Sequence, residues 1–416
     1  MQKRNLLTLA LLALVTLPTA SAQAAKTITI NCFSNLDEAV TAAIPAYKKL
    51  HPEVTIKLNV LAYGDHHTAL QTSLATGSGA GDVACIEVGF VGRFMEGGGL
   101  VNLDEAPYNV KQYKNLITAY AWTQATSTDG KNYSMPTDVA SGTMFYRKDV
   151  LDRLGVKVTD LNKSWDSFIA AGKKMKAKDP KVSLIGDAGQ VAELYWKANV
   201  PNGEYLFFDK SGKTVVDSPR FVKAFEIAKQ IREAKLDAKI GNWSPEWTDG
   251  LNKGTLAVQF FGAWFEGTMR GMVPTTKGMW RSADLPDKSF ASWGGSYYAI
   301  PKESKQKDAA WEFIKYMTLS KEGQLSSLKA ISALPSLKSA QALPELREPL
   351  AFLGGQVART TWVRNANKVQ PVDTNKLDAV AQEEIGKALT SVLEEGKDIK
   401  ASLAEAKVAI ERRQKR

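Results

Sequence analysis

The sequence predicts an α/β protein of two domains. Short strand-like and helix-like segments alternate in the N-terminal part of the chain, which is the pattern of a mostly parallel sheet with helical crossovers. The chain has 416 residues, more than one hydrophobic core usually serves. No long linker rich in Ser, Gly or Pro divides it. We therefore expect the chain to cross between the domains more than once.

The N-terminal alternation can be followed segment by segment. Residues 27–30 form a short strand, and residues 37–50 form a helix whose apolar positions recur at spacings of three and four. Residues 54–60 alternate apolar and polar side chains with period two, as a half-buried strand does. A short helix around residues 70–74 ends at the glycine-rich residues 77–81. An apolar strand follows directly.

The rest of the chain is richer in helices. Ser164 and Ser218 stand where helices begin, because serine is a preferred N-terminal cap. Apolar residues at helical spacing predict further helices at 311–317, 377–393 and 399–410. Trp165 and Trp311 lie on the apolar faces of such helices and are expected in the cores.

Residues 1–24 are expected to be a secretory signal peptide. Lys3 and Arg4 precede an apolar run, and Ala22-Gln23-Ala24 has the pattern of a cleavage site. The run is too short for a membrane span. No cysteine stands at the cleavage site, so we expect no lipid anchor. The expected location is the periplasm.

The formal net charge is +10, which by itself is compatible with nucleic-acid binding. However, basic and acidic residues are interleaved along the chain, and only 412–416 form a basic run. We therefore expect a solvated surface and no nucleic-acid partner.

Cys32 and Cys85 lie in the first and third strand-like segments, which are neighbours in a sheet of order 2-1-3. In an oxidising compartment they can form a disulfide, and two buried thiols are the alternative. The cysteine spacing fits no zinc motif. His66 and His67 are adjacent and diverge by about 100° on a helix, so we expect them at the surface or the cleft rim. No metal site is predicted.

Enzyme and cofactor motifs are absent from the sequence. There is no H-E-x-x-H, no G-x-S-x-G and no C-x-x-C. Residues 77–81 lack the last glycine of a dinucleotide-binding loop, and residues 211–214 lack the first glycine of a phosphate-binding loop. We expect a protein that is not an enzyme and needs no cofactor.

Several segments resemble the extracellular solute-binding proteins of carbohydrate ABC importers, the group that includes the maltose-binding protein. The strongest match is Trp293-Gly294-Gly295-Ser296-Tyr297-Tyr298-Ala299-Ile300-Pro301-Lys302. Other matches occur in the same order along the chain. They lie at 44–54, 70–83, 99–104, 135–149, 164–168, 254–264 and 307–314.

The resemblance implies a two-lobed periplasmic binding protein fold, in which each lobe is a mostly parallel sheet flanked by helices. A ligand cleft lies between the lobes. We place the first lobe at 25–136 plus 294–335 and the second at 137–293 plus 336–416. The implied function is capture of a sugar or short oligosaccharide by a monomer, and its delivery to the permease subunits of an ABC transporter. A glycerophosphate-type or other anionic solute is one alternative, and a secreted carbohydrate-active hydrolase is another.

Sugar recognition needs planar polar side chains for the hydroxyl groups and aromatic rings for the C–H face. The candidate ligand-binding residues are Asn35, Asp37, Asp65, Glu87, Asp138, Trp264, Trp293, Gly294, Gly295 and Arg364. Glu87 is chosen because ligands bind beyond the carboxyl ends of parallel strands. Trp264 and Asp138 are chosen because they lie in segments that resemble a ligand-contacting loop and an interlobe crossing.

Most candidates have a structural alternative, which for Trp293 is core packing. Helix capping is the alternative for Asn35, Asp37, Asp65 and Asp138. Core packing is the alternative for Trp264, and a turn is the alternative for the two glycines. A solvated side chain is the alternative for Arg364. Trp243 and Trp247 flank a helix start, where either role fits.

Overall fold

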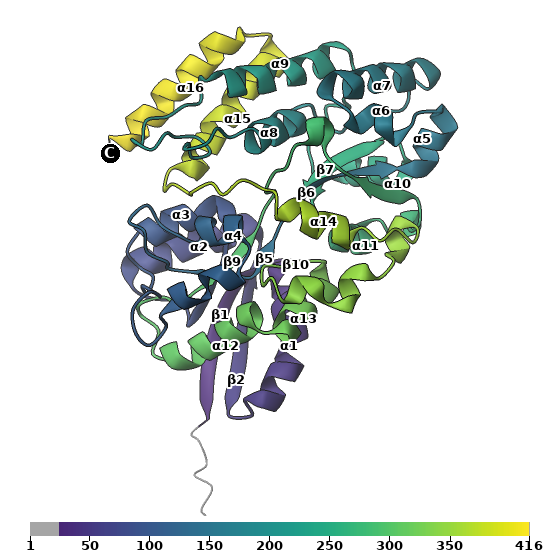
Figure 1. The fold of residues 1–416 in the computed structure, drawn as a ribbon. Helices are drawn as coiled ribbons and strands as arrows, with labels where there is room; N and C mark the ends of the chain where they lie inside the picture. Colours follow the sequence, from purple (N-terminus) through teal and green to yellow (C-terminus); the bar gives the residue numbers. More distant parts are fainter. Residues whose placement is uncertain (1–24, 416) are drawn as a thin grey trace, which may run out of the picture.

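The computed structural model describes residues 25–415, so the predicted signal peptide lies outside the described residues. Figure 1 shows two lobes stacked one above the other, with β1, β2, α12 and α13 in the lower lobe and α7, α9 and α16 in the upper one. The predicted two-lobed α/β fold is confirmed. Within residues 25–415, no helix has the length and apolar character that a bilayer crossing requires.

The first lobe is built around a single sheet. Its elements are β1 (Lys26–Phe33), α1 (Leu36–Leu50), β2 (Val54–Leu61), α2 (Tyr63–Thr76), β3 (Val83–Glu87), α3 (Val88–Glu96), α4 (Ala119–Gln124), β4 (Met135–Pro136), β9 (Ser296–Ala299), α12 (Lys307–Leu319) and α13 (Lys321–Ile331). The strand order is β2-β1-β3-β9-β4. Strand β1 pairs in parallel with β2 and β3, as predicted, whereas β9 is antiparallel to both of its neighbours.

Local sequence explains several of these elements. Helix α1 buries one stripe of apolar side chains, from Leu36 to Tyr47, as an amphipathic helix on a sheet does. Helix α2 ends at Gly77, whose φ of 70° is left-handed and suits glycine best. The side chains of β3 are buried up to Ile86.

A disulfide joins two adjacent strands of this sheet. Cys32 of β1 and Cys85 of β3 are bonded, with their Cα atoms 4.8 Å apart. The predicted adjacency of their strands is confirmed, and of the two alternatives the disulfide is the one formed.

The second lobe has a smaller sheet and more helices. Its elements are β6 (Gly142–Arg147), α5 (Lys148–Leu154), α6 (Val158–Asn162), α7 (Trp165–Lys178), α8 (Gly189–Ala198), α9 (Pro219–Glu233), α10 (Pro245–Lys253), β7 (Val258–Gly262), α11 (Phe265–Met272), β8 (Trp280–Ala283), α14 (Arg359–Ala366), α15 (Asp378–Glu395) and α16 (Ile399–Gln414). Ser164 caps α7 by accepting a hydrogen bond from the backbone of Ser167. Trp165 and Trp311 are buried in the cores, as predicted.

The pairing in the second lobe differs from the mostly parallel sheet expected. The order is β7-β6-β8, and β6 is antiparallel to both neighbours. Strands β7 and β8 therefore run in the same direction, with α11 between them along the chain, as in a parallel crossover unit. Strand β6 follows the passage from the first lobe and inserts between them, which reverses both pairings.

The chain passes between the lobes along segments that lie side by side. Strand β5 (Asp138–Val139) pairs antiparallel with β10 (Leu334–Pro335). The amide of Thr137 donates to the carbonyl of Ser296 at 2.9 Å. These segments are the ones predicted to cross, and in Figure 1 β5 and β10 lie between the two lobes.

Candidate functional site

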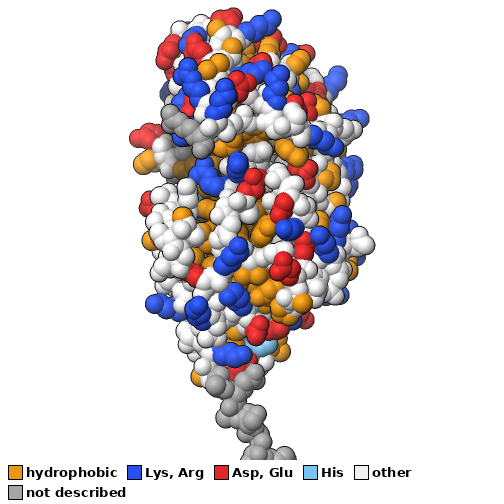
Figure 2. Space-filling model, turned by 90° about the vertical axis from the view of Figure 1, so that its left-hand side faces the viewer, with side chains coloured by type: hydrophobic (Ala, Val, Ile, Leu, Met, Phe, Trp, Pro, Cys, Tyr) orange, Lys and Arg blue, Asp and Glu red, His pale blue; other side chains and the backbone are white. Residues whose placement is uncertain are grey.

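A cavity of about 1230 Å³ lies between the lobes. The first lobe contributes the loop after β1, the end of β3 and the first turn of α3, and the second lobe contributes α8, α11 and the N-terminus of α15. The polar and aromatic lining includes Phe33, Asn35, Tyr63, Glu87, Phe90, Gln124, Asp138, Glu193, Lys197, Trp243, Trp264, Arg270, Trp293, Gln370, Asp373 and Gln382. Outside the cavity, the face in Figure 2 carries basic and acidic side chains intermixed.

The structure brings most of the predicted ligand-binding residues to this cavity. Those that line it are Asn35, Glu87, Asp138, Trp264, Trp293, Gly294 and Gly295. Asn35 precedes α1 but makes no side-chain capping bond, so the capping alternative does not account for it.

Three predicted residues lie outside the cavity lining. Asp37 and Asp65 stand in the first turns of α1 and α2, where a negative charge favours the helix dipole. Arg364 is exposed and pairs with Asp284 at 3.3 Å. Neither helix has a side-chain capping hydrogen bond, so the capping alternative does not hold for Asp37 and Asp65. The structure does not bring these three residues to the cavity lining.

Tryptophans form one wall of the cavity. The indole Nε1 of Trp264 donates to the carbonyl of Trp293 at 2.9 Å. Trp243 lies nearly parallel to Trp264, with ring centroids 6.2 Å apart and an angle of 14°. A Cβ atom at Gly262 would lie 2.3 Å from the Trp264 Nε1, so glycine is needed there for this ring position.

The sequence did not show which of Trp243 and Trp247 belongs to the ligand site. Pro245 begins α10 and Ser244 caps it, so Trp243 stays outside the helix while Trp247 enters it. Trp247 is fully buried, whereas Trp243 is 54% exposed. Trp243 also has a φ of 71°, which is rare for a bulky residue and is often found at ligand sites.

Glu87 closes the first-lobe wall at the end of β3. Its Oε2 accepts hydrogen bonds from the backbone N–H of Gly89 at 2.7 Å and from Tyr63 Oη at 2.9 Å. Glu87 therefore caps α3 and lines the cavity at the same time. Burial raises the pKa of this carboxyl because the charged form is poorly solvated.

Asp138 lies where the chain crosses between the lobes. Its Oδ1 accepts a hydrogen bond from the backbone N–H of Ser296 at 2.7 Å, which ties two crossing segments together. Burial, and to a lesser degree the neighbouring Glu87, raises the pKa of Asp138 to about 7.

The model of the bacterial extracellular solute-binding protein family matches residues 33–324 of the chain. The chain belongs to this family. The membership inferred from sequence segments is confirmed.

Two curated relatives and one solved structure illustrate the match. The chain is 29% identical over 343 residues to an arabinooligosaccharide-binding protein of Bacillus subtilis (strain 168), covering 78% of each protein. It is 25% identical over 385 residues to a lactose-binding protein of Rhizobium radiobacter, covering 84% of this chain and 85% of that protein. A crystal structure of an extracellular solute-binding protein of family 1 superposes with a TM-score of 0.80 at 23% identity, covering 93% of this chain and 99% of the other.

In this solute-binding protein, the second-lobe wall also carries an ion pair. Lys197 Nζ lies 2.6 Å from Glu193 Oε1 and 4.9 Å from the centre of the Trp293 ring. Both side chains line the cavity. They stand four residues apart on α8, which places them on one helix face. The sequence contains this spacing, but nothing in it indicates that the face borders a cavity.

Carboxyl groups outnumber basic groups in the lining. The carboxyl groups belong to Glu38, Glu87, Asp138, Glu193, Asp373 and Asp378, and the basic groups to Lys197 and Arg270. Both basic groups also pair with a glutamate, Lys197 with Glu193 and Arg270 with Glu266, so the lining provides little positive charge for an anionic ligand.

The prediction for the two adjacent histidines is wrong. His66 and His67 are buried, with 3% and 1% exposure. Both rings turn inward, toward the end of β3, because α2 packs against the sheet there. Among residues 25–415, no cluster of three or more His, Cys, Asp or Glu side chains is arranged to hold a metal ion.

Proposed function

We propose that this protein captures an oligosaccharide in the cavity between its lobes and delivers it to the permease of an ABC importer. The observation that carries the proposal is the composition of the cavity walls. Tryptophan rings and carboxyl and amide side chains together line a cavity of about 1230 Å³. Aromatic rings pack on the C–H face of a sugar, and the polar groups bind its hydroxyls.

The size and charge of the cavity narrow the ligand class. Pockets for drug-sized ligands are roughly 300–1,000 Å³, so this volume favours an oligosaccharide over a single sugar. The two basic groups of the lining are already paired with Glu193 and Glu266, which disfavours a glycerophosphate-type or other anionic solute. The similarity to an arabinooligosaccharide-binding protein supports a short pentose or hexose oligosaccharide.

We propose that binding occurs without catalysis. The carboxyl groups of Glu87 and Asp138 both line the cavity, and both accept backbone hydrogen bonds, from Gly89 in the first turn of α3 and from Ser296 at the lobe crossing. These bonds give both groups a structural role that requires no reaction. Incubation with arabinotriose, followed by product analysis, tests for hydrolysis.

The cellular setting is part of the same proposal. We place the mature protein in the periplasm because residues 1–24 have the pattern of a signal peptide, and the lack of a cysteine at the cleavage site favours a form without a lipid anchor. We expect it to act as a monomer. We assign the lobes to 25–136 plus 294–335 and to 137–293 plus 336–416. Contacts between the first-lobe strands and residues 296–299 support this division.

A thermal-shift series tests the function. The panel contains arabinotriose, lactose, maltotriose and glycerol 3-phosphate. A ligand present at 100 times its Kd stabilises the folded state by about 2.7 kcal/mol, so at least one oligosaccharide is expected to raise the Tm. A response to glycerol 3-phosphate alone would favour the anionic alternative.

A further inference from the structure

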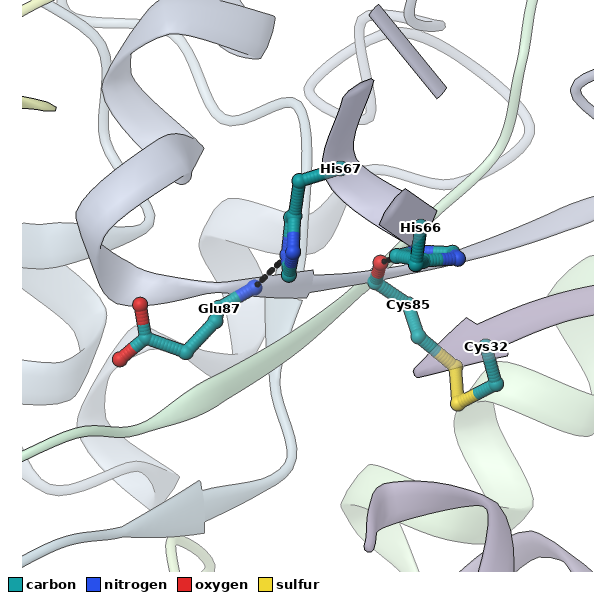
Figure 3. The surroundings of a disulfide bond; sticks show 5 residues. All are labelled: Cys32, His66, His67, Cys85 and Glu87. Carbon is teal, nitrogen blue, oxygen red and sulfur yellow. Dashed lines mark hydrogen bonds between the residues drawn. A yellow bond between two sulfur atoms is a disulfide. The ribbon is translucent and has the colours of Figure 1, made fainter. Parts of the chain in front are cut away.

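Helix α2 holds the end of β3 through its two buried histidines. His66 Nε2 lies 2.8 Å from the carbonyl oxygen of Cys85. His67 Nε2 lies 3.1 Å from the backbone nitrogen of Glu87, and its Nδ1 lies 2.7 Å from the carbonyl oxygen of Tyr63. Figure 3 shows both rings directed at this strand end, next to the disulfide.

The partners of His67 fix its protonation. A backbone N–H can only donate, so His67 Nε2 must accept the hydrogen bond from Glu87. A carbonyl oxygen can only accept, so His67 Nδ1 must carry the proton. The ring is therefore neutral, with its hydrogen on Nδ1. Burial lowers the pKa of His67 to about 4, which is consistent with that state.

The Glu87 carboxyl is held by α2 and by the first turn of α3. Tyr63 Oη and the Gly89 backbone N–H both donate to Oε2. Both of these hydrogen bonds use Oε2, which leaves Oε1 of this cavity-lining side chain outside them. Oε1 is thus the oxygen available to a ligand.

Neighbouring contacts restrict the movement of the His67 ring and of the end of β3. The His67 ring stacks on Phe90, with centroids 4.1 Å apart and an angle of 12°. Phe33 packs on the other side at 5.2 Å. The disulfide from Cys85 to Cys32 fixes β3 to β1 just before both strands reach the cavity.

We propose that His67 is a positioning residue of the ligand site: its neutral ring binds the backbone of Glu87 and Tyr63, and so aims the Glu87 carboxyl into the cavity. This inference rests on the proposed function for its ligand. His67 itself does not line the cavity, so it acts through Glu87.

The test compares His67→Leu, which removes the acceptor, with His67→Gln, whose amide oxygen can replace it. His66→Leu is the matched control, because it removes a buried histidine that binds the same strand two residues earlier. The affinity for arabinotriose is measured by calorimetry. The Tm of each variant is measured in the absence of ligand. Exchange of the Glu87 amide hydrogen is measured by NMR.

We expect His67→Leu to weaken arabinotriose binding about tenfold, which corresponds to about 1.4 kcal/mol and lies within the range for one hydrogen bond. His67→Gln should recover most of the affinity. His66→Leu should lower the Tm by a similar amount but change the affinity less. In a Glu87→Ala background, His67→Leu should have no further effect on affinity, since a double-mutant cycle isolates the coupling.

Two results would overturn the inference. One is an equal loss of affinity in His66→Leu and His67→Leu that persists in the Glu87→Ala background, because this would show a purely structural role. The other is an unchanged exchange rate of the Glu87 amide in His67→Leu. The exchange measurement needs no ligand, so it decides the role of His67 even if the unaltered protein binds no saccharide and the proposed function fails.

Discussion

Trp264→Ala should separate ligand binding from folding stability. Trp264 lines the cavity, lies nearly parallel to Trp243 and keeps its indole N–H bonded to the carbonyl of Trp293. Truncation of a buried aromatic side chain at the centre of an interface costs roughly 2 kcal/mol or more. We therefore expect the Kd for an oligosaccharide to rise about thirtyfold. The ring is only partly buried, so the loss of stability should be smaller than the roughly 3–5 kcal/mol of a fully buried tryptophan.

The control is Trp280→Phe. Trp280 is fully buried and lies outside the cavity, and its Nε1 donates to Thr276 Oγ1 at 2.9 Å. This variant should lose about 1–2 kcal/mol of unfolding free energy and keep its affinity. Calorimetry gives the Kd, and urea unfolding gives the stability. If Trp264→Ala left the Kd unchanged while its unfolding midpoint fell below that of Trp280→Phe, the assignment of Trp264 to the ligand site would be wrong.

Three further variants test other parts of the structure. Protonated Asp138 stabilises the fold fully below its unfolded pKa of 3.8, and this stabilisation is lost as the pH rises through about 7. Asp138→Asn should remove the corresponding pH dependence of the unfolding free energy, which is worth roughly 4 kcal/mol at most. If urea unfolding between pH 4 and 8 showed the same pH dependence in the variant and the unaltered protein, the prediction would be wrong. Replacing both Cys32 and Cys85 with Ala opens a loop of 53 residues and should lower the unfolding free energy by about 4 kcal/mol, as measured by urea unfolding. An unchanged unfolding free energy would show that the disulfide does not restrict the unfolded chain as expected. A Cβ atom at Gly267 would lie 2.6 Å from the carbonyl oxygen of Ile331 in the other lobe. Gly267→Val should therefore hold the lobes apart and weaken ligand binding. An unchanged radius of gyration in small-angle scattering, together with an unchanged Kd, would refute this.

The parts of the fold that depend on local sequence were predictable. The end of α2 at Gly77 and the cap of α7 at Ser164 depend on residues within one helical turn. The 2-1-3 strand order also follows from sequence because consecutive crossovers set it. The second sheet was not predictable in the same way. Strand β6 pairs with β7 and β8, which lie more than a hundred residues later in the chain, and no local pattern specifies that insertion.

The same division applies to the site. Glu87 and Asp138 could be found because strand ends and lobe crossings have a fixed place in the architecture. Trp243 could not be separated from Trp247, since the two differ only in which side of a helix start they occupy. His66 and His67 were misplaced because an unpaired polar residue is more often exposed. Their burial depends on carbonyl and amide partners in β3, which lie 19 and 20 residues away in the chain.

The two walls of the cavity have complementary tasks, and this explains why both lobes are needed. The first-lobe wall offers a carboxyl group whose orientation is fixed by α2, by the cap of α3 and by the disulfide behind it. The second-lobe wall offers the tryptophan surface and the Glu193–Lys197 pair. A sugar can bind one wall through its hydroxyl groups and pack its C–H face on the other wall only when the two walls are close. The ligand therefore favours the closed arrangement of the lobes. Close approach is built into the contact between α11 and α13, where Gly267 leaves room for the backbone of Ile331. Affinity in this protein should therefore depend as much on how well the lobes meet as on any single residue in the cavity.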